Sequence, residues 1–123
     1  MVRNFKFQDL LWLEPIAKKY GEWEPMLTAL ENKVASMVDP GHSIIVLHND
    51  AHGVCFSAVT DEQGIKGFIK MVRTVVRLCY EEGMTFHGHY EQGSWQARVA
   101  VGQGLLWDGA MYVFTPYVRA ETG

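Results

Sequence analysis

The chain has 123 residues, the length of one domain, and 48% of them are apolar, enough to bury a core without disulfides. Its formal net charge of −3 argues against a protein that binds nucleic acid through bulk electrostatics. No apolar run approaches the roughly 20 residues of a membrane span, and polar residues interrupt the N-terminal segment where a signal peptide needs an apolar core. We expect one domain over residues 1–123, cytoplasmic or particle-bound rather than secreted, with Cys55 and Cys79 as buried free thiols.

The N-terminal third predicts one short strand and two helices. Residues 2–7 alternate modestly, as a first strand would. Residues 9–21 have an acidic start, apolar residues at helical spacing and a terminal glycine, and Pro15 marks a first turn or a kink there. A second helix is expected from Glu24–Pro25, with an apolar stripe that reaches Val38.

The central segment predicts a β-hairpin followed by a long helix. Residues 43–47 and 54–59 are apolar runs rich in β-branched residues, and turn-forming residues separate them at 48–53. Residues 67–82 have a clean helical period, and Gly83 follows as a C-cap.

The C-terminal third predicts a strand at 84–90, a short helix at 94–101 and a hairpin of strands at 105–107 and 111–117. The connection between the strand at 54–59 and the strand at 84–90 is long enough for a parallel crossover. We therefore expect an α/β fold, a mixed twisted sheet with helices on both faces.

Three segments carry a resemblance to a known family: VRNFKFQDLLWLEPIAKKY, HSIIVLHNDAHGVCFSAV and GSWQARVAVGQGLLWDGAMYVFTPY. They are similar to the first strand and helix, the central hairpin, and the last helix and hairpin of the GNAT superfamily of N-acetyltransferases. The resemblance covers nearly the whole chain and implies a single GNAT-like domain. One departure is that the family places three antiparallel strands before its long helix, whereas only two are evident here.

The family holds acyl-CoA at a turn of type [QR]-x-x-G-x-[GA], where backbone N–H groups at a helix N-terminus bind the pyrophosphate. The corresponding turn, 61–67, has suitable residue types at different spacing, and Asp61 and Glu62 add negative charge. The turn is therefore either a cradle for acetyl-CoA or a capping turn that only starts a helix. If it is a cradle, the cofactor-binding residues are Val59, Gln63, Gly64, Lys66 and Gly67.

The catalytic side chains that the resemblance implies are absent. Alignment on Gly104 places Gly93 where the family tends to have Asn, and Ala100 where it has the Tyr that protonates the leaving thiolate. Tyr90 or Tyr112 could substitute from a neighbouring strand, although a core or rim tyrosine is the simpler interpretation. His87 is a candidate general base. Catalytic residues therefore stay unassigned, with His87 and Tyr112 as the candidates.

Histidines gather in two places. His87 and His89 would project from one face of their strand, about 6–7 Å apart, which suits a metal pair. His48, Asp50 and His52 could add ligands from the hairpin turn. No motif fixes the distance between the two groups, so we interpret them as surface or rim histidines and predict no metal site.

A basic stripe and an exposed tryptophan suggest a protein interface. Lys66, Lys70, Arg73 and Arg77 follow helical spacing beside the apolar face of the long helix. They form a solvated side, a contact for an acidic partner or a contact for CoA phosphates. Among the tryptophans, Trp12 and Trp107 are expected to be buried and Trp23 exposed. The interface candidates are Trp23, Lys70, Arg73 and Arg77.

The missing catalytic groups favour a degenerate GNAT-like protein that binds a protein partner or a second copy of itself. Small GNAT-like domains without catalytic motifs resemble internal virion proteins of short-tailed phages, which implies a phage structural protein. The alternative is an active N-acetyltransferase that moves acetyl from acetyl-CoA to an amine. No membrane or nucleic-acid partner is expected.

Overall fold

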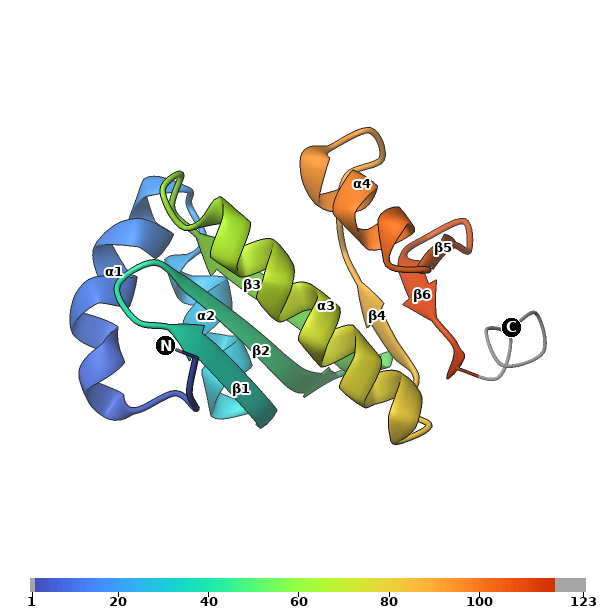
Figure 1. Cartoon of the computed structure of the whole chain (residues 1–123), viewed down its shortest axis with the longest axis horizontal. Helices are drawn as coiled ribbons and strands as arrows, with labels where there is room; N and C mark the ends of the chain where they lie inside the picture. Colours follow the sequence, from blue (N-terminus) through green and yellow to red (C-terminus); the bar gives the residue numbers. More distant parts are fainter. Residues whose placement is uncertain (1, 117–123) are drawn as a thin grey trace.

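Within residues 2–116, six strands form one mixed sheet (Figure 1). The computed structural model describes residues 2–116. The strands are β1 (Lys33–Asp39), β2 (Ser43–Asp50), β3 (Gly53–Thr60), β4 (Phe86–Gly88), β5 (Leu106–Trp107) and β6 (Tyr112–Phe114). Their order in the sheet is β1-β2-β3-β4-β6-β5, and β3 and β4 are the parallel neighbours. The α/β class and the mixed sheet are as predicted.

Helices cover both faces of this sheet (Figure 1). They are a 3-10 turn (Phe7–Asp9), α1 (Leu10–Lys19), α2 (Trp23–Glu31), α3 (Ile65–Glu81) and α4 (Trp95–Gly102). α1 and α2 pack on one face, whereas α3 and α4 pack on the other. Within residues 2–116, no helix is both long enough and apolar enough to pass through a membrane.

The parallel crossover from β3 through α3 to β4 confirms the predicted topology. α3 forms because its apolar residues repeat at helical spacing on the buried side, where Phe68, Met71, Val75 and Cys79 enter the core. The ladder between β3 and β4 contains a single pair of residues, Cys55 and His87. The two strands are therefore joined at one point.

The prediction that the second helix reaches Val38 is wrong. α2 ends at Glu31, and residues 33–39 form β1, which pairs antiparallel with β2. The spacing of Val34 and Val38 fits a helical stripe and also fits alternate faces of a strand. Pairing with β2 gives the backbone groups on one edge of this segment hydrogen-bond partners, and this overrides the local pattern. Three antiparallel strands therefore precede α3, not the two that the sequence suggested.

Other boundaries differ by a few residues. The expected strand at 2–7 is a single bridge between Arg3 and Val38. β2 and β3 continue to Asp50 and Gly53, so the turn is shorter than the predicted one and His48 lies in a strand. The last strand ends at Phe114, and Tyr117 lies outside the described residues.

The core consists of two clusters, one on each side of the sheet. The cluster under α3 and α4 contains a stacked row of rings, in which Phe86 lies between Phe56 and Phe114 at centroid distances of 5.5 and 5.0 Å. The cluster under α1 and α2 includes Leu13 and Ile44, both fully buried.

One charged side chain is buried where the chain enters α1. Asp9 is 1% exposed, and both oxygens of its carboxylate accept hydrogen bonds from the guanidinium of Arg3 at 2.7 and 2.8 Å. The backbone N–H of Lys6 and the indole N–H of Trp12 also donate to it, at 2.7 and 2.9 Å. The bonds from Arg3 are the main reason why the pKa of Asp9 falls to about 2.

We predict that Asp9→Asn lowers the free energy of unfolding by about 2 kcal/mol near pH 7, because the ionised form of Asp9 is favoured in the folded state. Since its folded pKa lies below the unfolded value, this contribution is present above about pH 4 and is lost as the pH falls through about 2. Urea unfolding at several pH values should show the wild-type and variant curves converging in acid.

The control is Glu14→Gln, which removes an exposed ion pair with Lys18. It should change the free energy of unfolding by less than about 0.5 kcal/mol. A difference between Asp9→Asn and wild type that stays constant with pH would contradict this assignment.

Candidate functional site

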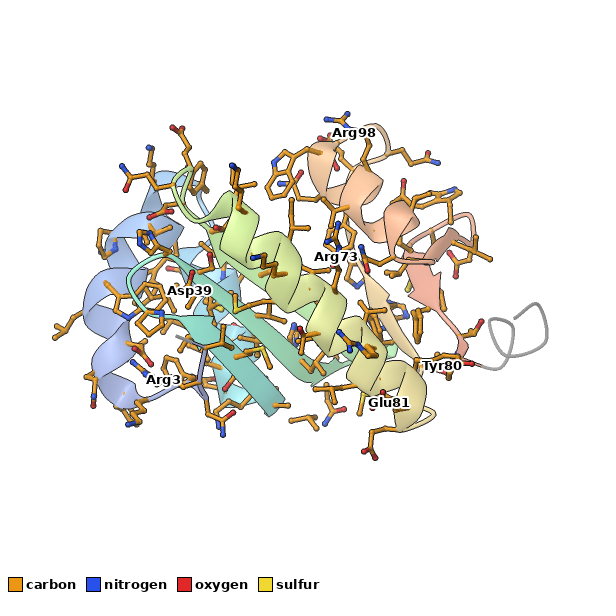
Figure 2. The ribbon with its side chains drawn as sticks, in the orientation of Figure 1. Arg3, Asp39, Arg73, Tyr80, Glu81 and Arg98 are labelled. Atoms are coloured by element: carbon orange, nitrogen blue, oxygen red, sulfur yellow. The ribbon has the colours of Figure 1, made fainter. Side chains whose placement is uncertain are left out.

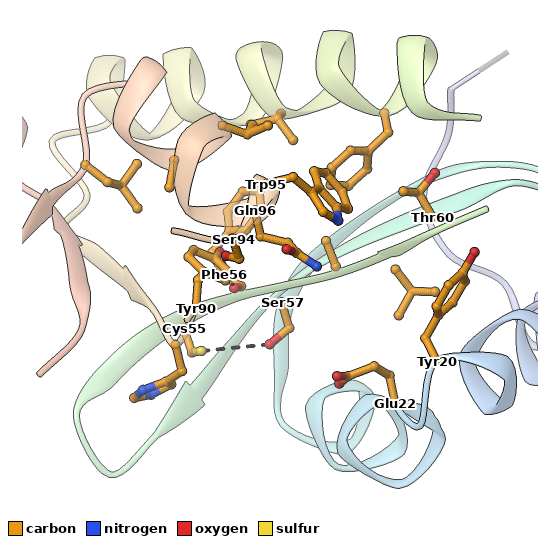
Figure 3. A pocket seen from close by; sticks show the side chains of 18 of the residues that line it. Tyr20, Glu22, Cys55, Phe56, Ser57, Thr60, Tyr90, Ser94, Trp95 and Gln96 are labelled. Carbon is orange, nitrogen blue, oxygen red and sulfur yellow. Dashed lines mark hydrogen bonds between the residues drawn. The ribbon is translucent and has the colours of Figure 1, made fainter. Parts of the chain in front are cut away.

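A cavity opens where β3 and β4 diverge beyond their single pair (Figure 3). Its volume is about 500 Å³, within the range of small-molecule sites. β3 contributes residues 55–60 as one wall, and α3 and α4 close the apolar side with Phe68, Trp95 and Ala100. From Phe56 onward, the backbone of β3 is no longer paired with β4.

Tyr90 extends from the end of β4 into this divergence. Its hydroxyl donates a hydrogen bond to the backbone carbonyl of Phe56 at 2.9 Å, so a side chain bridges the two strands where a ladder would otherwise continue. Its ring lies directly over Gly88, where an added Cβ would overlap it. Burial raises the pKa of the Tyr90 hydroxyl far above its usual value, which makes the group a poor proton donor at neutral pH.

The charged residues around the cavity are mostly acidic. Glu22, Glu62 and Glu91 line it, and among residues 2–116 its lining includes neither Lys nor Arg. Glu22 reaches the cavity beside Tyr20, from the connection between α1 and α2 (Figure 3). The cavity therefore suits a neutral or cationic group better than a polyanion.

The N-terminus of α3 is occupied by a carboxylate of the chain. Asp61 Oδ1 accepts a hydrogen bond from the backbone N–H of Gly64 at 2.6 Å, and its other oxygen lies 2.9 Å from Nδ1 of His42. This contact with Asp61 raises the pKa of His42. Gly64 is packed tightly, because an added Cβ would lie 2.7 Å from the Cβ of His42.

A second carboxylate, that of Asp39 at the end of β1, lies beside the first turn of α3. A Cβ added at Gly67 would be 2.9 Å from Oδ2 of Asp39. Two carboxylates thus lie at the positive end of the α3 dipole, where the family would bind pyrophosphate. Of the predicted cofactor-binding residues, Val59 lines the cavity, Gly64 and Gly67 pack against the chain, and Gln63 and Lys66 are exposed outside the cavity lining.

The candidate catalytic residues do not converge on the cavity. Tyr112 is a core residue on β6, with its ring centroid 5.1 Å from that of Trp107 at an interplanar angle of 58°, and His87 lies outside the cavity lining. Ala100 does line the cavity, where it contributes a methyl group and no proton donor. Gly93 lies in the loop before α4 with a φ of 83°.

Apart from the cavity, a cluster of polar side chains lies near the turn of the β2–β3 hairpin. It is on the same face of the sheet as Val46 and Val59. Nε2 of His87 donates to Oδ2 of Asp50 at 2.8 Å, and Nε2 of His89 lies 3.3 Å from the same oxygen. Burial opposes ionisation of Asp50, but these bonds and the backbone N–H of His52 hold its pKa below the usual range. The two strand histidines therefore do share a face, as predicted.

Cys55 and His48 lie next to this group. Burial raises the pKa of the Cys55 thiol to about 11, and its sulfur is 3.8 Å from the hydroxyl of Ser57. His48 contacts the same hydroxyl through Nε2 at 2.7 Å, and burial lowers its pKa. Both cysteines are free and buried, as expected. The sequence did not indicate that Cys55 would face His87, because that depends on the β3–β4 register.

The interface candidates fall into two environments. Lys70, Arg73 and Arg77 are exposed on α3, away from its buried apolar residues, as predicted; Arg73 is labelled in Figure 2. The expectation that Trp23 is exposed is wrong, since it is half-buried against the cluster under α1 and α2. The opposite expectation for Trp107 is also wrong: it is 40% exposed, because β5 is an edge strand with one neighbour.

No protein-family model, no curated protein and no solved structure matches this chain.

Proposed function

We propose that this chain is a non-catalytic, GNAT-like domain that acts through contacts with a protein partner. The resemblance is supported by the order of the elements, with three antiparallel strands before the long helix, a parallel crossover, and a final helix and hairpin. It is further supported by the divergence of β3 and β4, where the family places the pantetheine arm of its cofactor.

The contact between Asp61 and Gly64 is the observation that carries the non-catalytic assignment. At 2.6 Å, the carboxylate takes the backbone N–H that a pyrophosphate oxygen would need. Asp39 lies beside the next glycine of the turn and Glu62 lines the cavity, so an incoming polyanion would face three carboxylates. Like charges at these distances disfavour binding even near a helix N-terminus.

The interior of the cavity also supports the non-catalytic assignment. The Tyr90 side chain bonds to the β3 backbone in the position that a pantetheine arm would use, and its hydroxyl has a raised pKa. Ala100 offers no proton for a leaving thiolate. Acyl transfer would therefore lack its cofactor contacts and its acid.

The outer face of α3 is the surface on which we place the partner. Lys66, Lys70, Arg73 and Arg77 are exposed there, and within residues 2–116 none of them forms an ion pair with a carboxylate. Ile65 and Leu78, at opposite ends of the helix, are 38% and 47% exposed. A surface that combines cationic side chains without carboxylate partners and exposed apolar side chains suits contact with an acidic protein surface. Such a partner fits a structural role, and a phage virion is the setting that the resemblance implies.

The alternative, an active N-acetyltransferase, is favoured by one observation, the open cavity of about 500 Å³. We predict that acetyl-CoA at about 1 mM will leave the melting temperature unchanged. A cofactor with a Kd of about 10 μM would instead stabilise the fold by about 2.7 kcal/mol, a rise of several degrees. Thermal-shift and calorimetric titrations measure both quantities.

Pantetheine, which lacks the phosphates, is the matched control ligand. If pantetheine raises the melting temperature and acetyl-CoA does not, the charge of the phosphates is what excludes acetyl-CoA. A saturable rise in melting temperature with acetyl-CoA would contradict the non-catalytic assignment.

We predict that Arg73→Glu combined with Arg77→Glu abolishes partner capture, because it reverses the charge of the proposed contact. The matched control is Lys19→Glu, an exposed lysine on α1, which packs on the opposite face of the sheet. Quantitative affinity capture should recover the same partner with wild type and Lys19→Glu but lose it with the double variant. Equal recovery with all three proteins would refute the surface assignment.

A further inference from the structure

Asp50, Cys55 and His87 lie on three adjacent strands, His89 follows the end of the third, and the four side chains meet at one point. One ligand-type atom from each lies within 4.8 Å of all the others. Asp50 ends β2, Cys55 is near the start of β3, and His87 lies on β4 directly opposite Cys55. Cys55 and His89 also line the cavity, whereas Asp50 and His87 lie outside its lining, and none of the four belongs to the basic face of α3.

We propose that these four residues form a binding site for a single Zn²⁺ ion. The ligand set is two imidazoles, a thiolate and a carboxylate, which is the chemistry that Zn²⁺ selects. Tetrahedral ligand atoms at Zn²⁺ bond lengths are separated by about 3.3–3.8 Å. The present separations include 2.8 Å from His87 Nε2 to Asp50 Oδ2 and 3.3 Å from His89 Nε2 to the same oxygen. Side-chain adjustments of about 1 Å therefore convert this cluster into a tetrahedron.

The directions of the side chains support the site as strongly as the distances do. Both histidines present Nε2 to the same carboxylate oxygen, and their rings are nearly perpendicular, with an interplanar angle of 75°. The other oxygen of Asp50 accepts the backbone N–H of His52 at 2.7 Å, which fixes the carboxylate in this orientation. Asp50, Cys55 and His87 lie on paired strands, which hold such a geometry better than loops do.

The solvent-exposed side chains of the cluster give the ion a path to the site. The side chains of Asp50 and His89 are 26% and 49% exposed, whereas His87 is 6% exposed. A metal can thus enter from the solvent side and find its buried ligands, His87 and Cys55, behind the exposed pair. Four protein ligands leave no open coordination position, so we assign a structural role. The ion would cross-link β2, β3 and β4 where the β3–β4 ladder has a single pair.

Cobalt is a suitable spectroscopic probe for the experiment. The full chain, stripped of metal with a chelator, is titrated with Co²⁺ and then with Zn²⁺ as competitor. We expect one equivalent to bind, with the visible bands of tetrahedral Co²⁺ and an ultraviolet thiolate-to-metal band. Zn²⁺ should displace Co²⁺ and raise the melting temperature by several degrees.

Variants then test the ligands one at a time. Cys55→Ser should remove the thiolate band, and His89→Asn, at an exposed position, should weaken Zn²⁺ binding at least about 100-fold. The controls are Cys79→Ala, a buried thiol elsewhere, and His42→Asn, which removes a histidine paired with a different carboxylate. Both controls should bind as wild type does. The proposal is overturned by the absence of one-to-one binding in wild type, by unchanged binding in Cys55→Ser or His89→Asn, or by equal loss in either control.

Discussion

The arrangement of this molecule depends on how little β3 and β4 are paired. A crossover through α3 brings the two strands side by side, yet only Cys55 and His87 form a ladder pair. Beyond this pair the strands diverge, and the space between them becomes a cavity whose far wall is α4. At the pair itself, the opposite face of the sheet brings a thiol, two imidazoles and a carboxylate together. The short β3–β4 ladder thus accounts for both the cavity and the cluster of possible metal ligands.

Charge is distributed unevenly around α3 and the cavity. Asp61 and Asp39 lie at the positive end of α3, and glutamates line the cavity, so the interior disfavours polyanions. The lysine and arginine side chains of α3 face outward and form no ion pair with a carboxylate among the described residues. Carboxylates therefore surround the N-terminus of α3 and line the cavity, whereas the outer face of the helix is basic and suits an acidic partner surface better than the cavity does.

Features set by local pattern could be predicted from the sequence, and features set by partners could not. α3 and the β2–β3 hairpin follow from periodicity and turn residues. Residues 33–39 fit either a helix or a strand, and only the presence of β2 decides between them. The meeting of Cys55 with His87 depends on a register between distant strands, which no local pattern records. The basic face of α3 was predictable because one helix carries all of it.

The overlap between the ring of Tyr90 and the space above Gly88 has a consequence for how such a chain can evolve. Any larger residue at position 88 would evict the ring, and any small residue at position 90 would open the groove between the strands. The two positions should therefore covary among relatives of this protein. A chain that accommodated a ligand between these strands would need a smaller residue at position 90, so the size of this one ring sets the width of the groove.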